Sequence, residues 1–147
     1  MGLLSPADQD KLRASFSEMT SNVRVLFFTQ SLDCETCLHT RHILDELPAL
    51  SDKIAIEEVN FVLEKEKATQ YGIDRVPALA LLADGSNGDG RDSRIRFLGA
   101  PSGYEFISLV QALLLVGGRA SSLTDENRQK LAAVDKPMTV QVFTTPT

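Results

Sequence analysis

The sequence predicts a three-layer α/β domain built on a four-stranded mixed sheet. Strand and helix patterns alternate through the first half, which favours parallel pairing by right-handed crossover connections. Two later strands are joined by a short glycine-rich turn, which indicates an antiparallel hairpin. Apolar residues make up 43% of the chain and charged residues 24%, the composition of a globular domain. We expect this domain to be complete by about residue 118, with helices on both faces of the sheet.

The first elements follow from capping signals and periodicity. A helix is predicted over residues 5–19, because a Ser-Pro signal precedes apolar residues at helical spacing. It is an extra helix ahead of the first strand. VRVLFFT (23–29) is β-branched and aromatic and too short for a helix, so it predicts a buried strand. CLHTRHILDEL then continues at helical period until Pro48 ends or kinks the helix.

The second half predicts one more helix between strands, then a hairpin and a closing helix. IAIEEVNFV (54–62) alternates as a strand does, and Gly72 ends the helix that follows it. The remaining predicted elements are a strand at 73–83, a turn at 84–93, a strand at 94–99 and a helix at 101–118.

Residues 119–147 repeat the layout of the opening of the chain. They predict a capped helix from Thr124, a short linker and a strand at 138–144, the same order as the first helix and strand. We therefore expect two parts: a complete unit over 1–118, and the first helix and strand of a second, truncated unit over 119–147.

Charge and hydropathy exclude several function classes. The net charge is −5 and the basic residues are scattered, which argues against nucleic-acid binding. The longest apolar run is too short to span a membrane, and the first residues do not form a secretory signal. With two cysteines and no export signal, we expect a reducing, cytoplasmic environment.

The two cysteines, Cys34 and Cys37, follow a predicted strand and begin a predicted helix. A helix N-terminus favours negative charge, and a CxxC pair there lowers a cysteine pKa from about 8.5 into a range of roughly 3.5–7.5. This position predicts Cys34 as an attacking thiolate and Cys37 as the resolving thiol. A CxxC alone also fits half a zinc site or chance. His39 and His42 are too close on one helix to complete a tetrahedral site, so no metal is expected.

Two acidic residues, Asp33 and Glu35, flank the first cysteine. One interpretation is that they cap the helix start and are solvated. The other is that their charges disfavour the Cys34 thiolate. The second interpretation predicts a less acidic cysteine and a less oxidising pair.

The dipeptide Val76–Pro77 stands at the entrance of a predicted strand, where a proline deletes a ladder N–H. A cis peptide bond beside an open strand edge would accommodate it. Val76 would then offer its backbone N–H and C=O to an extended peptide, which would pair as an added strand near the sulfur atoms.

Together the strand, CETC and helix, then YGIDRVPALALL and FLGAPSGYEF, resemble the thioredoxin fold. The chain is most similar to the two-unit protein disulfide oxidoreductases, which are glutaredoxin-like proteins of thermophilic archaea and bacteria. The N-terminal module of the alkyl hydroperoxide reductase flavoprotein is a near alternative. The resemblance implies that Cys34 is the nucleophile, Cys37 the resolving cysteine and Pro77 a cis-proline with Val76 as peptide-binding backbone. It implies no cofactor beyond the redox-active disulfide.

Two features depart from that family. The buried aspartate that ordinary thioredoxins carry before CxxC has no counterpart, since the strand offers Phe27 and Phe28. Proton transfer from Cys37 would then use another group such as Glu58, unless Glu58 is a solvent-facing strand residue. The sequence also ends at Thr147, before a second CxxC, so we expect a truncated form.

The resulting hypothesis is a thiol–disulfide oxidoreductase that acts on protein disulfides. Two alternatives remain: a non-catalytic module that docks peptides or partners, and an electron-relay domain in a peroxide-reducing system. The expected partners are protein disulfides and a thioredoxin reductase-type flavoprotein or a peroxiredoxin. Residues 120–147 are expected to pack on their own unit or to exchange with a second chain in a homodimer.

Overall fold

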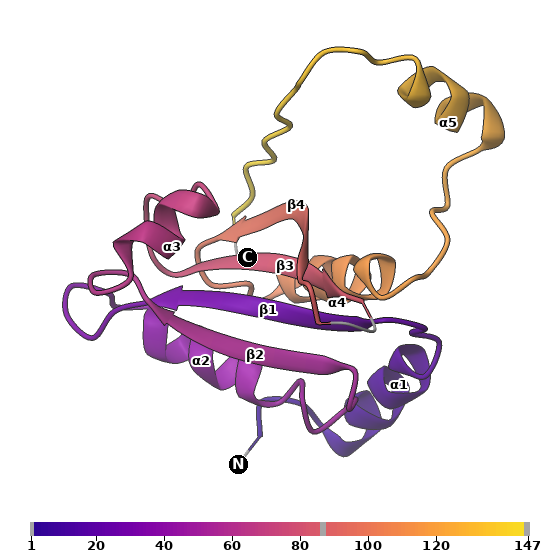
Figure 1. The fold of residues 1–147 in the computed structure, drawn as a ribbon. Helices are drawn as coiled ribbons and strands as arrows, with labels where there is room; N and C mark the ends of the chain where they lie inside the picture. Colours follow the sequence, from indigo (N-terminus) through magenta and orange to yellow (C-terminus); the bar gives the residue numbers. More distant parts are fainter. Residues whose placement is uncertain (1, 86–87, 146–147) are drawn as a thin grey trace.

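A four-stranded sheet in the order β2-β1-β3-β4 forms the centre of the molecule (Figure 1). The computed structural model describes residues 2–85 and 88–145. The elements in chain order are α1 (Pro6–Phe16), β1 (Asn22–Thr29), α2 (Cys37–Asp45), β2 (Ile54–Asn60), α3 (Lys65–Gln70), β3 (Ala78–Asp84), β4 (Arg91–Leu98), α4 (Tyr104–Val116) and α5 (Asp125–Ala132). The predicted order of elements through α4 is confirmed.

The strand pairing makes the sheet mixed, as expected. β1 and β2 are parallel and are connected through α2, whereas β3 is antiparallel to both β1 and β4. In this register Phe28 of β1 pairs with Ala78 of β3, and Ala78 pairs in turn with Leu98 of β4. The carboxyl end of β1, the start of β3 and the end of β4 therefore lie at one end of the sheet.

Helices cover the two faces of the sheet unequally. Alternate residues of β1 point to opposite faces: Val23, Val25 and Phe27 join a core with α1, α2 and α4, whereas Leu26 and Phe28 face α3. Figure 1 shows α3 alone over the second face. The three-layer architecture is thus confirmed, with a single short helix as its third layer.

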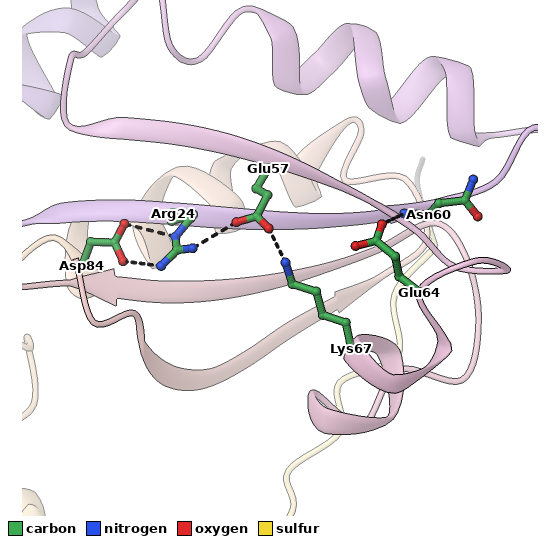
Figure 2. Close-up of polar contacts among 6 residues, drawn as sticks. All are labelled: Arg24, Glu57, Asn60, Glu64, Lys67 and Asp84. Atoms are coloured by element: carbon green, nitrogen blue, oxygen red, sulfur yellow. Dashed lines mark hydrogen bonds and ion pairs between the residues drawn. The ribbon is translucent and has the colours of Figure 1, made fainter.

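Ion pairs occupy the part of the second face beyond α3. Arg24, which alternation places on this face, donates to Asp84 at 2.9 Å and to Glu57 at 3.0 Å. Lys67 reaches Glu57 from α3, so residues of β1, β2, β3 and α3 are linked (Figure 2). Hydrogen bonds from Lys67 and Arg24 lower the pKa of Glu57, against the effect of burial. Two positive and two negative side chains are thus paired on this face.

The connection from β2 to α3 is held by a reciprocal side-chain arrangement. The Asn60 side chain accepts from the N–H groups of Val62 and Leu63, each at 3.0 Å. The Glu64 carboxylate accepts from the Asn60 N–H at 2.8 Å (Figure 2). These bonds satisfy backbone N–H groups of the turn that precedes α3.

The C-terminal segment differs from its prediction. The capped helix forms as expected, with the Thr124 side chain accepting from the Asn127 N–H at 3.2 Å. The predicted strand at 138–144 is wrong, because these residues form no regular secondary structure. A strand needs a neighbour for its ladder bonds, and the described part of this segment pairs with no strand of the sheet. Pro146 and Thr147 lie outside the described residues.

The segment also does not pack on the domain. Residues 118–145 are all exposed, and α5 stands away from the sheet before the chain returns toward it (Figure 1). The return is marked by a hydrogen bond from the Thr144 hydroxyl to the Glu105 carboxylate. The expectation that this segment packs against its own unit is therefore wrong for the described residues.

Two predicted boundaries also shift. β3 begins at Ala78 rather than at residue 73, because residues 73–77 form a loop without ladder pairing. β4 begins at Arg91, inside the turn expected over 84–93, and residues 86 and 87 of that turn lie outside the described part of the chain.

Candidate active site

A disulfide joins Cys34 and Cys37, with their Cα atoms 5.5 Å apart. The pair lies in the connection between β1 and α2, at the end of the sheet where β3 begins. Cys34 is half-buried, whereas Cys37 is only 5% exposed. The sulfur that a large partner can approach is thus that of Cys34, while Cys37 is shielded behind it.

The helix begins later than expected relative to this pair. Cys37 is the first residue of α2, and Thr36 caps it without a side-chain hydrogen bond. The first hydrogen bond of the helix runs from the Thr40 N–H to the Thr36 C=O at 2.9 Å. Cys34 therefore precedes the helix by a turn, instead of standing at its first position. Both cysteines still lie at the positive end of the helix dipole.

Asp33 and Glu35 are exposed on either side of Cys34. Neither side chain caps α2, so the capping interpretation is wrong, whereas solvation is confirmed. Asp33 adopts a positive φ of 54°, a conformation that aspartate tolerates better than most residues. Gln30 supports this bend by donating from its side chain to the Leu32 C=O at 2.7 Å.

Val76–Pro77 is a cis peptide bond, as expected. Val76 precedes Ala78, the first paired residue of β3, so its backbone lies outside the sheet ladder. The Pro77 C=O accepts from the Gly99 N–H at 2.8 Å, which ties this turn to the end of β4. Since Ala78 pairs with Phe28, the dipeptide and the disulfide loop leave the sheet at the same end.

Glu58 is bound to a residue that sequence reasoning missed. Its carboxylate accepts from the Arg41 guanidinium at 2.5 Å and is 50% exposed. Arg41 lies one helical turn after Cys37 in α2, and this spacing was a usable signal. The Nε atom of Arg41 is buried and has no hydrogen-bond partner among the described residues. Glu58 is thus a solvent-facing residue of β2, as one interpretation expected, and it is paired with an arginine.

A cavity of about 240 Å³ lies beside α2. His39 and Ile43 of α2 form one wall, and Pro101 and Phe106 form another. The N-terminal residues Leu3 and Leu4 also line it, and the Glu46 carboxylate holds them there by accepting from the Leu4 N–H at 3.1 Å. Its lining is mainly apolar.

Within the described ranges, no group of three or more His, Cys, Asp or Glu side chains is arranged to hold a metal ion. His39 and His42 are exposed on α2. No helix in the described part of the chain has the length and apolarity needed to cross a membrane.

The chain is similar to several known proteins. No family model matches the sequence. A probable thioredoxin of Methanothermobacter thermautotrophicus is 34% identical over 93 residues, which are 63% of this chain and 94% of that protein. The chain belongs to the thioredoxin family. Its expected fold and its class, thiol–disulfide oxidoreductase, are confirmed.

Two solved structures share the fold of this chain. The N-terminal domain of the alkyl hydroperoxide reductase AhpF of Enterococcus faecalis matches with a TM-score of 0.79 and 29% identity, covering 90% of this chain and 62% of that one. A protein disulfide oxidoreductase of Aeropyrum pernix matches with a TM-score of 0.73 and 23% identity, covering 88% of this chain and 54% of that one. This thioredoxin-family chain therefore spans little more than half of both structures.

Proposed function

We propose that the chain exchanges dithiols and disulfides with protein substrates through Cys34 and Cys37. The observation that carries this proposal is the unequal exposure of the pair, since a half-buried Cys34 lies in front of a buried Cys37. An exposed thiolate attacks the partner, and a shielded neighbour resolves the mixed disulfide.

In the reducing direction, the Cys34 thiolate attacks one sulfur of the substrate disulfide. A Cys34–substrate disulfide forms, and the other substrate sulfur leaves as a thiolate. Cys37, after losing its proton, attacks the Cys34 sulfur. The Cys34–Cys37 disulfide forms and the second substrate thiol is released, so two electrons pass from the chain to the substrate. A dithiol or a thioredoxin reductase-type flavoprotein then restores the reduced pair.

Other residues have supporting roles in this proposal. The backbone of Val76, outside the sheet ladder, pairs with the extended substrate beside Pro77. Asp33 and Glu35 modulate the Cys34 thiolate through their charges. Glu58 is paired with Arg41, which lies one helical turn after Cys37 in α2. Through this pair, Glu58 is proposed to influence the proton of Cys37.

An insulin-reduction assay tests this proposal. Wild type should reduce insulin with dithiothreitol as the electron source, and Cys34→Ser should fall to the rate of dithiothreitol alone. Equal rates in both would remove the pair from the mechanism and favour a non-catalytic docking module. A redox titration gives the direction of electron flow: a reduction potential of about −270 mV indicates a reductase, and one of about −120 mV indicates an oxidant.

A second candidate is an electron relay within a peroxide-reducing system. The likeness to the AhpF domain favours it, at 29% identity over 90% of the chain. Delivery of electrons to a peroxiredoxin, followed by peroxide consumption, would support the relay. Rapid reduction by a thioredoxin reductase with no transfer to a peroxiredoxin would support general disulfide reduction instead.

We further propose that residues 1–118 are one unit and that 119–147 begin a second. The AhpF likeness supports this, since it covers 90% of the 147 residues and so continues past residue 118. The exposed apolar residues Val140, Val142 and Phe143 support exchange of this segment with a second chain in a homodimer. The reactive cysteine pair supports a cytoplasmic location.

A further inference from the structure

Residues 71–77, here called the proline loop, connect α3 to β3 and end in Val76 and Pro77. The first amides of the loop bond back to α3: the Gly72 N–H donates to the Thr69 C=O at 3.1 Å and the Ile73 N–H to the Ala68 C=O at 2.8 Å. The far end is tied to Gly99, as described above. The position of Tyr71, where the loop begins, depends on another strand.

Arg96 of β4 holds Tyr71 in two ways. Its Nε atom donates to the Tyr71 C=O at 3.0 Å, and its guanidinium carbon lies 5.7 Å from the centre of the Tyr71 ring. The ring also packs against Phe28 of β1, with the ring centres 6.3 Å apart. Because Phe28 pairs with Ala78, this contact ties the start of the loop to the strand that the loop enters.

Asp92 fixes the direction of the Arg96 guanidinium. The two terminal nitrogens of Arg96 donate to the two carboxylate oxygens of Asp92, at 2.8 and 2.7 Å. This hydrogen bonding lowers the pKa of Asp92, so its carboxylate stays charged to a lower pH than a free aspartate does. The Arg96 side chain is 21% exposed. A lysine could not replace it fully, because one ammonium cannot supply the planar fork together with the bond to Tyr71.

We propose that Arg96 is a positioning residue for protein-substrate recognition, which sets the proline loop so that Val76 can pair with an extended peptide. The proposal rests on the function proposed above, since it names a residue that acts on the same site. Arg96 lies on the face of the sheet that α3 covers. It acts through Tyr71 and not on the reacting sulfur atoms.

The kinetic test compares Arg96→Met and Arg96→Lys with a matched control, Arg91→Met, which removes an exposed positive charge from the same strand. With insulin as substrate, Arg96→Met should raise KM about tenfold and leave kcat within about twofold, as expected for lost binding that is common to ground and transition states. Arg96→Lys should be intermediate. With a small aromatic disulfide, which does not need strand pairing, all variants should match wild type. Equal insulin KM values in Arg96→Met and Arg91→Met would overturn the proposal, as would an equal loss on both substrates.

A structural readout separates this proposal from the proposed function. Amide hydrogen exchange at Gly72 and Ile73 should accelerate in Arg96→Met and stay unchanged in Arg91→Met. Unchanged protection in Arg96→Met would overturn the positioning role, even in an active protein. If the wild type reduced no disulfide, the proposed function would be wrong. The amide hydrogen exchange rates would still decide whether Arg96 holds the proline loop in position. Arg96→Lys, which keeps the charge over Tyr71, carries the test if Arg96→Met does not fold.

Discussion

At the scale of residues, the difference in burial between Cys34 and Cys37 has a direct chemical consequence. In the reduced protein, we expect iodoacetamide to modify Cys34 at least about tenfold faster than Cys37, because the thiolate must be both formed and accessible. Peptide mapping by mass spectrometry measures both rates. Equal rates for the two cysteines would contradict the assignment of Cys34 as the attacking thiol.

The charges of Asp33 and Glu35 lead to a second prediction. Replacing them together, as Asp33→Asn with Glu35→Gln, should lower the pKa of Cys34, because two negative neighbours of the thiolate are removed. The ultraviolet absorbance of the thiolate against pH measures it. Asp52→Asn, an exposed acid away from the pair, is the control. An unchanged or raised Cys34 pKa in the double variant would show that these acids do not act on the thiolate.

Much of the candidate site could be predicted from short stretches of sequence. CETC after a buried strand and Val76–Pro77 before another were sufficient to predict the disulfide and the cis bond. The partners of Glu58 and Tyr71 were not predicted, because each contact joins elements that the topology alone brings together. Arg41 reaches β2 from α2, and Arg96 reaches across from β4.

At the scale of elements, the ion pairs around Glu57 make its contribution to the stability of the fold depend on pH. The folded state lowers the pKa of Glu57 below its ordinary value of 4.5, so its contribution is complete above pH 4.5 and is lost as pH falls through the lowered pKa. Glu57→Gln should therefore reduce the free energy of unfolding by about 1 kcal/mol at neutral pH.

Urea unfolding at several pH values measures this difference. The gap between wild type and Glu57→Gln should narrow below pH 4.5, as the wild-type carboxylate is protonated. Glu66→Gln, on an exposed position of α3, should show a smaller change with little pH dependence. A gap that stays constant into acid would mean that the Glu57 charge is not what Arg24 and Lys67 stabilise.

The observed strand boundaries show that the sequence pattern alone does not predict where a strand forms. The run from residue 73 to 83 is mainly apolar, yet only residues from Ala78 onward form β3, because the proline loop has no ladder partner. The segment at 138–144 has a strand-like composition and forms no strand, for the same reason. Strand propensity alone does not supply a neighbour.

At the scale of the whole molecule, the exposed segment after residue 118 predicts a dependence on concentration. In dilute solution a variant ending at residue 118 should match the full chain in unfolding free energy within about 0.5 kcal/mol, since every described residue of the removed segment is exposed. As concentration rises, only the full chain should gain in Tm, because exchange into a dimer stabilises it by mass action.

Thermal unfolding and analytical ultracentrifugation measure the two effects together. Val142→Asp in the full chain should behave like the shortened variant, because it places a charge in the proposed contact. A full chain that stays monomeric at high concentration, with an unchanged Tm, would contradict the exchange. The predicted layout of one complete unit followed by the start of another would then need a different partner for residues 138–144.

The exchange reaction itself is tested most directly by trapping its intermediate. Reduced Cys37→Ser retains Cys34 as its only thiol, so attack on a protein disulfide should stop at a covalent mixed disulfide. Mass spectrometry after incubation with insulin should find the adduct on Cys34, and its mass should disappear on adding dithiothreitol. Cys34→Ser should trap far less, because Cys37 is buried. No adduct on Cys34, or equal adducts in both variants, would contradict the account.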